Sequence, residues 1–279
     1  MAAAAAVAAK ITAVWKHNFQ QEIFRLDVVL FRFPVVSFDT EFPGFFQNTP
    51  RDAIDLTRYK DLRHNVDPSR LIQFGITVAD ARGNIGDNDI DFDKLRRDKI
   101  DFDMFAQLLS HVVARHRNLC WVTFHGLYDL LHTLRAVTNR PLPNSIADFI
   151  SLLGIVLGDV VDIKYMARFC QGLRGGELGL TAIAKILNVE RVGGTHQAGS
   201  DSLLTGVYSK MRLVYKIHET PCMGCLYGIS ARICKPIVVP NTNRRYFIPC
   251  FSTTAPFQHC FPPYCSGFMQ AAPPFSHVL

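Results

Sequence analysis

The chain has 279 residues, which is long for one average domain and short for two full ones. Apolar residues make up 48% of the sequence and charged residues 19%. This composition is typical of packed globular proteins and excludes an intrinsically disordered chain. The 30 Lys and Arg residues against 24 Asp and Glu residues give a net charge of +6. That excess mildly favours a polyanionic partner but is far below the charge of a protein that coats nucleic acid.

No run of about 18 uncharged apolar residues occurs, so we expect no membrane span and no membrane partner. Residues 1–10 are rich in alanine but lack the basic start and the strong hydrophobes of a secretory signal, which predicts a short Ala-rich leader. Of the 8 cysteines, only Cys120 and Cys170 lie before residue 220. This distribution indicates a reduced intracellular protein rather than a disulfide framework.

Composition changes near the C-terminus, where prolines and the other six cysteines gather and no helical period survives. We therefore predict a leader at residues 1–10, one large domain at residues 11–230 and an irregular Pro/Cys-rich tail at residues 231–279. The six cysteines after residue 220 could ligate zinc in principle. They contain one CxxC, Cys222 to Cys225, and no second pair follows at regular spacing, so we do not expect a zinc site.

Strand-like and helix-like patterns alternate through the large domain, which predicts an α/β fold with a mixed sheet flanked by helices. Period-two and apolar runs predict strands at residues 33–42, 71–79 and 119–124, and a weaker strand at 85–93. Helical spacing predicts helices at residues 102–114, 128–137 and 181–187, and a longer one at 201–217 that Ser200 caps.

Two carboxylates stand out at the end of the first predicted strand. Side chains alternate on a strand, so Asp39 and Glu41 project from one face while Thr40 projects from the other. Like charges on one face repel each other, and burying them together requires a cation. An exposed polar edge is the alternative interpretation, with about equal weight on this segment alone.

Two further acids occupy comparable places. Asp129 lies in the first turn of the helix after the strand at 119–124, where an acid is also an ordinary partner of the helix dipole. Asp201 again lies in a first helical turn, after a loop with three glycines that carries His196. The glycines of this loop suggest that it brings the imidazole of His196 close to the carboxylate of Asp201.

Four carboxylates and a loop histidine form a chemically consistent set. Hard oxygen ligands suit Mg²⁺ or Mn²⁺. Two such ions about 3.5–4 Å apart can stabilise the attacking and leaving oxygens of a phosphodiester displacement. A histidine with an intrinsic pKa near 6.5 can take the proton from the attacking water.

Seven segments of the chain carry recognisable motifs: FDTEFPG at 38–44, LRHNVD at 62–67, LIQFG at 71–75, WVTFH at 121–125, YD at 128–129, DIKY at 162–165 and HQAGSDSLLT at 196–205. These motifs resemble those of the Caf-type (Pop-type) deadenylases of the CCR–NOT complex (carbon catabolite repressor four), which belong to the DEDD class of exoribonucleases. The similarity covers roughly residues 10 to 230 and is most specific at 196–205.

This resemblance implies an RNase H-like fold and removal of 3′ poly(A) from messenger RNA with release of 5′-AMP, using two divalent metal ions. It implies that Asp39, Glu41, Asp129 and Asp201 are the catalytic metal-binding acids and that His196 is the general base. The implied partners are poly(A) RNA, a large scaffold subunit and a second deadenylase of the complex. The implied location is the cytoplasm and the nucleus.

The chain departs from the family in two places. Where the family has Ser-Gly-Tyr-Asp, residues 126–129 read Gly-Leu-Tyr-Asp, and bulky Leu127 could narrow the nucleotide site. The segment 83–105 is also shorter than usual. We therefore keep two alternatives: a catalytically impaired paralogue that serves as a scaffold, and a generic 3′–5′ exonuclease of the same fold.

Overall fold

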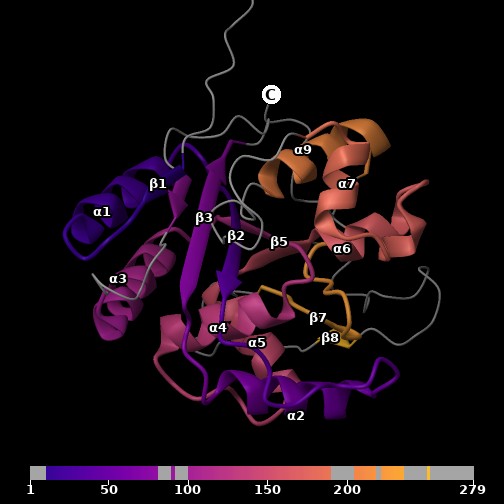
Figure 1. Cartoon of the computed structure of the whole chain (residues 1–279), viewed down its shortest axis with the longest axis horizontal. Coiled ribbons are helices and arrows are strands. Elements are labelled where there is room, and N and C mark those ends of the chain that lie inside the picture. The colour runs from indigo at the N-terminus through magenta and orange to yellow at the C-terminus, as the bar shows by residue number, and fades with distance from the viewer. Residues whose placement is uncertain are drawn as a thin grey trace, which may run out of the picture.

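The computed structural model describes residues 11–80, 89–91, 100–189, 204–217, 221–235 and 250–251. Its centre is a six-stranded sheet (Figure 1). From one edge to the other the strands are β1 (Ile11–Ala13), β4 (Asp89–Asp91), β3 (Gln73–Ala79), β2 (Val35–Glu41), β5 (Cys120–Thr123) and β6 (Asp159–Asp162). β2, β5 and β6 run parallel, whereas β3 runs antiparallel to β2. The predicted mixed α/β sheet is confirmed.

Helices cover both faces of this sheet, and each face has its own hydrophobic cluster. The larger cluster lies under α1 (Phe19–Val29), α2 (Asp55–Val66), α3 (Phe102–Arg115), α4 (Leu127–Thr138) and α5 (Ile146–Val156). The smaller cluster lies under α6 (Ile163–Met166), α7 (Leu180–Ile186), α9 (Leu204–Tyr215) and short 3₁₀ turns at Ala167–Phe169 and Arg174–Gly176. Figure 1 shows α1 and α3 on one side of the sheet and α6, α7 and α9 on the other. In the described part of the chain, no helix has the length and apolar character needed to span a membrane.

The predicted strands that form β2, β3 and β5 and the predicted helices that form α3, α4 and α7 are present. The weak strand at 85–93 is represented by the three residues of β4. The start of the helix predicted at 201–217, with its cap Ser200, lies outside the described residues, and α9 confirms the remainder. The sequence did not predict α1, α2 or α5.

The C-terminal boundary of the packed region differs from the prediction. Residues 231–235 were assigned to an irregular tail, but β7 (Ala231–Arg232) pairs with β8 (Cys250–Phe251), and Ile233 is buried in the larger cluster. A Cβ atom at Gly154 would overlap the carbonyl oxygen of Cys234, so this segment passes directly over α5. Residues 231–235 therefore pack against the domain, and the division of the chain into leader, domain and tail stays a prediction.

Candidate functional site

The two faces of β2 carry different residues. Val36 and Phe38 belong to the larger cluster and Val35 to the smaller one. By alternation, Asp39 and Glu41 lie on the face of the smaller cluster, which α9 covers, and both are half-buried. The predicted projection of the two carboxylates from one face is therefore confirmed.

Asp129 approaches the same strand from the other face. It lies in the first turn of α4, is 7% exposed, and accepts two hydrogen bonds from Thr40 on one oxygen. The backbone N–H of Thr40 lies 2.9 Å from Oδ1 of Asp129, and the Thr40 hydroxyl lies 2.6 Å from the same atom. The structure thus attaches Asp129 to the residue between Asp39 and Glu41.

A tight junction between β5 and α4 places Asp129 there. Gly126 precedes the helix, and a Cβ atom at this position would overlap the side chain of buried Thr123. Glycine therefore lets the helix begin only four residues after the strand ends. Leu127, which we expected near the nucleotide site, is 4% exposed and part of the larger cluster. Its effect on a nucleotide remains a prediction.

Burial changes the acid strength of Asp129. Loss of solvent raises the pKa of its carboxyl to about 6, the two hydrogen bonds from Thr40 oppose the shift, and the nearby Asp162 carboxylate adds to it. A nearby cation stabilises the ionised form of a buried carboxylate whose pKa is raised. This is the chemistry expected of a metal-binding acid before its metal is bound.

The remaining predicted site residues, His196 and Asp201, lie outside the described residues. Among the residues that are described, no three His, Cys, Asp or Glu side chains form a complete metal site, and this holds for Cys222 and Cys225 as well. The predicted set of four acids therefore depends on Asp201 and remains a prediction.

A group of cations and rings, which the sequence did not single out, lies at the neighbouring strand ends. The ammonium of Lys164 lies 4.9 Å from the ring centre of Tyr227 and 5.7 Å from that of Phe124. The ring of His125 contacts Tyr227 edge to face at 5.1 Å. Loss of solvent around the ring, and then the positive charges of Lys164 and Arg58, lower the pKa of His125. Lys164 has no carboxylate at ion-pair distance in the described part of the chain.

Buried Asp162 organises this group. Its carboxylate accepts hydrogen bonds from four backbone N–H groups, those of His125, Lys164, Tyr165 and Tyr227. It also caps the first turn of α6. The geometry gives Asp162 a structural role, because both of its oxygens accept hydrogen bonds from the backbone.

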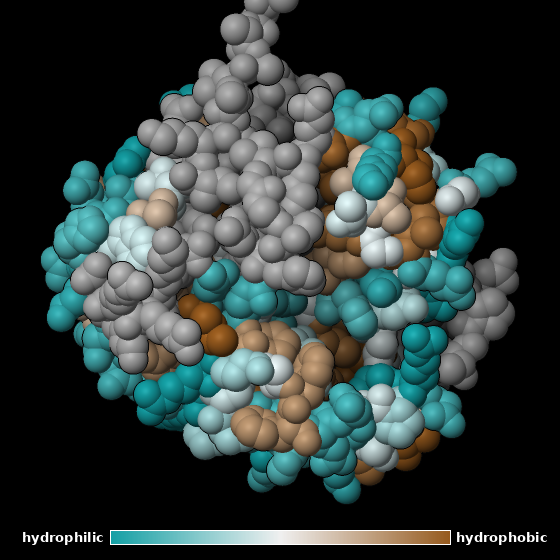
Figure 2. All heavy atoms as spheres, viewed as in Figure 1, coloured by the Kyte–Doolittle hydropathy of each residue, from teal (hydrophilic) through white to brown (hydrophobic). Residues whose placement is uncertain are grey.

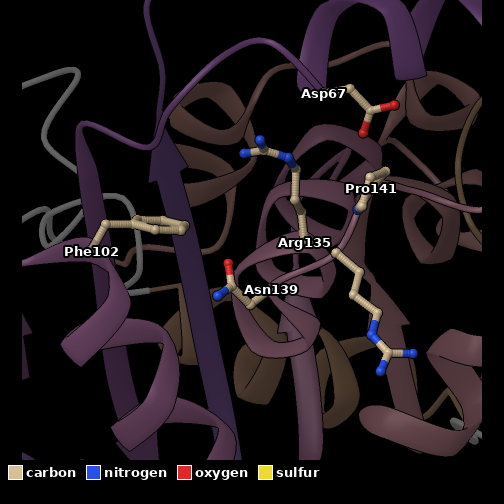
Figure 3. A pocket seen from close by; sticks show the side chains of 6 residues that line it. Asp67, Phe102, Arg135, Asn139 and Pro141 are labelled. Carbon is tan, nitrogen blue, oxygen red and sulfur yellow. The ribbon is translucent and has the colours of Figure 1, made fainter.

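A separate cavity of about 180 Å³ lies at the other end of α4 (Figure 3). Figure 3 shows Phe102 of α3 and Asp67 at the end of α2 facing it from two sides. Arg135 donates to the carbonyl oxygen of Ser69, and Asp67 accepts from the backbone of Leu142. These polar groups hold the fold together and lie at the opposite end of α4 from Asp129.

Comparison with known proteins places the chain in a family. It is 35% identical over 246 residues to "Probable CCR4-associated factor 1 homolog 1" of Arabidopsis thaliana, covering 78% of this chain and 68% of that protein. It is 36% identical over 226 residues to "Probable CCR4-associated factor 1 homolog 5" of the same plant, covering 71% and 81%. The chain belongs to the CCR4-associated factor 1 family. No protein-family model matches it.

Solved structures agree with this membership. A structure of Pop2p from S. pombe, in its Mg²⁺- and Mn²⁺-bound form, aligns with a TM-score of 0.71 at 31% identity and covers 78% of this chain and 99% of that one. The RNase domain of yeast Pop2 aligns with a TM-score of 0.67 at 24% identity, covering 79% and 94%, and supports the fold alone. The chain therefore has the RNase H-like fold of a CCR4-associated factor 1 nuclease of the deadenylase type.

Proposed function

We propose that this CCR4-associated factor 1 protein is a 3′–5′ exoribonuclease that removes poly(A) from messenger RNA, releases 5′-AMP and requires divalent metal ions. One observation carries the proposal. Asp39 and Glu41 project together at the end of β2, and Asp129 is bonded to Thr40 between them. This arrangement brings three acids from segments about 90 residues apart to one strand end.

The donor set fits a hard divalent cation. Carboxylate oxygens are the ligands that Mg²⁺ and Mn²⁺ prefer, and burial raises the pKa of Asp129, so a nearby cation would favour its ionised form. S. pombe Pop2p has been solved with both ions. In our proposal Asp39, Glu41, Asp129 and Asp201 would hold two ions, which would supply charge stabilisation for phosphodiester hydrolysis.

Two residues of the protein are proposed to deprotonate the attacking water and to position a metal-binding acid. His196 takes the proton from the attacking water, a role that suits an imidazole near neutral pH. Thr40 is a positioning residue, because its hydroxyl and its N–H fix the orientation of the Asp129 carboxylate. Release of the leaving 3′ oxygen then yields 5′-AMP and a chain shortened by one nucleotide.

We also propose that the protein works within the CCR4–NOT complex, with a scaffold subunit and a second deadenylase, in the cytoplasm and the nucleus. A yeast CAF1 crystallised with the NOT1 MIF4G domain has the same fold, with a TM-score of 0.68 at 23% identity over 78% of this chain and 96% of that one. Family membership supports the proposed complex.

A second candidate is a catalytically impaired paralogue that acts as a scaffold. It is supported by the same hydrogen bonds, because Oδ1 of Asp129 already accepts both donors of Thr40. In this candidate the third acid serves the fold and the chain contributes its surfaces to the complex.

One assay separates these candidates. Purified protein is incubated with Mg²⁺ or Mn²⁺ and a 5′-labelled twenty-nucleotide oligoadenylate, beside Asp39→Ala and the matched control Asp52→Ala, which removes an exposed acid outside the site. We expect stepwise shortening with release of 5′-AMP. Asp39→Ala should be slower by about 100-fold or more, because several kcal/mol of charge stabilisation are lost, and Asp52→Ala should be unchanged.

The other outcomes are equally informative. Absence of adenylate release by the wild type would support the scaffold and reject the enzyme. Equal trimming of oligoadenylate, oligouridylate and DNA would indicate a generic exonuclease. His196→Ala should lose most of the activity and keep much of the metal binding, and an unchanged rate would remove it as the base.

A further inference from the structure

Two phenylalanines are exposed directly after the carboxylate strand. Phe45 and Phe46 follow Glu41 by four and five residues and are 56% and 65% exposed. Figure 2 shows apolar surface in the lower middle of this face, in the region where the chain leaves β2 and where α4 lies in Figure 1. Large exposed apolar side chains next to a candidate site indicate a surface that something covers.

Phe45 is the outer end of a column of aromatic groups. Phe42 lies against His132, with 4.8 Å between ring centres and 26° between ring planes, and against Tyr128 at 5.2 Å and 26°. Phe45 contacts Tyr128 at 4.8 Å and 52°, and Phe42 at 5.6 Å and 64°. The column runs from buried His132 to exposed Phe45, so two rings support Phe45 from behind at tilted angles.

Buried hydrogen bonds fix the backbone that carries these rings. The carbonyl of the Asn65 side chain accepts from the backbone N–H groups of Phe46 and Gln47, at 2.8 and 2.9 Å. Its amide donates to the carbonyl of Gln47 at 2.8 Å and to the hydroxyl of Tyr128 at 2.9 Å. Asn65 is 2% exposed. One buried side chain therefore joins the exposed loop to the column, and the exposure of the rings is built into the fold.

Positive side chains lie beside the column, together with one buried acid. Loss of solvent raises the pKa of Tyr128 and lowers that of His125; the nearby Asp61 carboxylate raises the pKa of Tyr128 further, and the charge of Arg58 lowers the pKa of both groups. Its guanidinium donates to backbone carbonyls of residues 50, 51 and 53, and its Nε is buried without a hydrogen-bond partner in the described part of the chain. Lys164, beyond His125, has only ring contacts there. Positive groups beside aromatic rings are the combination that binds single-stranded nucleic acid.

We propose that Phe45, with Phe42 and Tyr128 behind it, and its neighbour Phe46, which contacts His64, form a platform on which bases of single-stranded RNA stack near the 3′ end. This inference rests on the proposed function and deepens it. Stacking accepts any base but is stronger for larger rings, so the platform contributes a preference for purines. Arg58 and Lys164 lie where phosphates of the same strand can reach them.

A thermodynamic cycle between protein and RNA tests the platform. Binding of a 5′-fluorescein ten-nucleotide oligoadenylate is measured by fluorescence anisotropy with Mg²⁺, in an Asp39→Ala background that slows cleavage by about 100-fold or more. The second ligand is the same oligomer with three abasic residues at its 3′ end. The variants Phe45→Ala and Phe46→Ala are compared with Phe24→Ala, a matched control of 68% exposure on α1.

The platform predicts coupling between ring and base. Each Phe→Ala change should weaken binding of the intact oligomer by about 5- to 150-fold, the range for one stacked base. Binding of the abasic oligomer should change little, Phe24→Ala should match its parent for both ligands, and Phe45→Trp should restore binding. All these variants alter exposed side chains, so folding is preserved.

Several outcomes would overturn the inference. Equal binding of the intact oligomer by Phe45→Ala, Phe46→Ala and their parent would do so. The same would follow if the loss of affinity caused by the abasic residues were equal in the variants and their parent. In that case the rings would be assigned to the binding of a protein partner. Failure of the proposed function gives a different result. If the wild-type protein releases no adenylate but the coupling between ring and base persists, the proposed nuclease activity is rejected and the platform is kept. If the wild-type protein shortens oligoadenylate but no coupling between ring and base is measured, only the platform is rejected.

Discussion

Two adjacent strand-to-helix junctions each contain a buried acid, and they use it differently. β5 and β6 are parallel neighbours in register, with Thr123 opposite Asp162, and a helix follows each strand. At the β6–α6 junction the acid is Asp162, which is 0% exposed. At the β5–α4 junction the acid is Asp129, which is 7% exposed. Burial raises the pKa of both carboxyls.

The difference lies in the donors. Asp162 accepts from four backbone N–H groups: those of Lys164 and Tyr165 in its own junction, that of His125 in the β5–α4 junction, and that of Tyr227. Asp129 accepts from the backbone N–H and the side-chain hydroxyl of Thr40, which lies on β2 and 89 residues away in the chain. An acid whose two oxygens are both used by backbone N–H groups stabilises the junctions that it joins. An acid that reaches across to the strand of Asp39 and Glu41 is available for chemistry at that strand end.

The largest expected effect is loss of the Asp162 carboxylate. We predict that Asp162→Ala lowers the free energy of unfolding by about 3–5 kcal/mol, because four buried N–H groups lose their acceptor. Urea denaturation measures the change. The control is Asp159→Ala on the same strand, which removes a half-exposed ion pair with Lys235 and should cost less than about 1 kcal/mol. Similar losses of unfolding free energy in the two variants would contradict the structural role of Asp162.

A smaller effect is expected at Thr40. Thr40→Val keeps the shape of the side chain and the backbone hydrogen bond but removes the hydroxyl that donates to Asp129. Because hydrogen bonds to charged groups are worth about 1.5–3 kcal/mol, we expect a loss of about 2 kcal/mol in urea denaturation and a slower nuclease. Thr40→Ser retains the hydroxyl and should retain most of the stability and most of the nuclease rate. Equal behaviour of Val and Ser at this position would contradict the positioning role.

The sequence predicted the strands and helices whose patterns are unambiguous. Alternation on β2 predicted the shared face of Asp39 and Glu41 because the strand period of two allows one arrangement. α2 was missed because its buried residues include Asp61 and Asn65, which a hydrophobic pattern does not count. α5 was missed because the apolar residues of Ile146–Val156 surround the helix, so periodicity cannot separate it from a buried strand.

The site was predicted in part for a similar reason. Residue types and spacing identified Asp39, Glu41 and Asp129 as candidate acids, but the bond from Thr40 to Asp129 joins distant segments and depends on how α4 packs on the sheet. The exposed rings were missed because a phenylalanine in a sequence indicates the core, and only the packing of the loop on Asn65 brings Phe45 and Phe46 to the surface. The CCR4-associated factor 1 family was predicted from motifs, and the comparisons confirm it.

The smallest expected effect concerns the ionisation of Asp129 in divalent-free buffer. The pKa of its carboxyl is about 6 in the folded chain and 3.8 in the unfolded chain. A raised pKa means that the folded chain retains a proton that the unfolded chain has lost, so the resulting stability is present below about pH 4 and disappears as the pH rises through 6. Between pH 5 and pH 8 this amounts to about 1 kcal/mol.

Asp129→Asn cannot titrate at this position. The difference in unfolding free energy between wild type and Asp129→Asn should therefore move by about 1 kcal/mol in favour of the variant between pH 5 and pH 8. Mg²⁺ at pH 8 should reverse that change, because a cation stabilises the ionised carboxylate that only the wild type has. A constant difference at both pH values, with and without Mg²⁺, would place Asp129 with Asp162 as an acid of the fold, since a carboxylate that gains nothing from a cation is not a metal ligand.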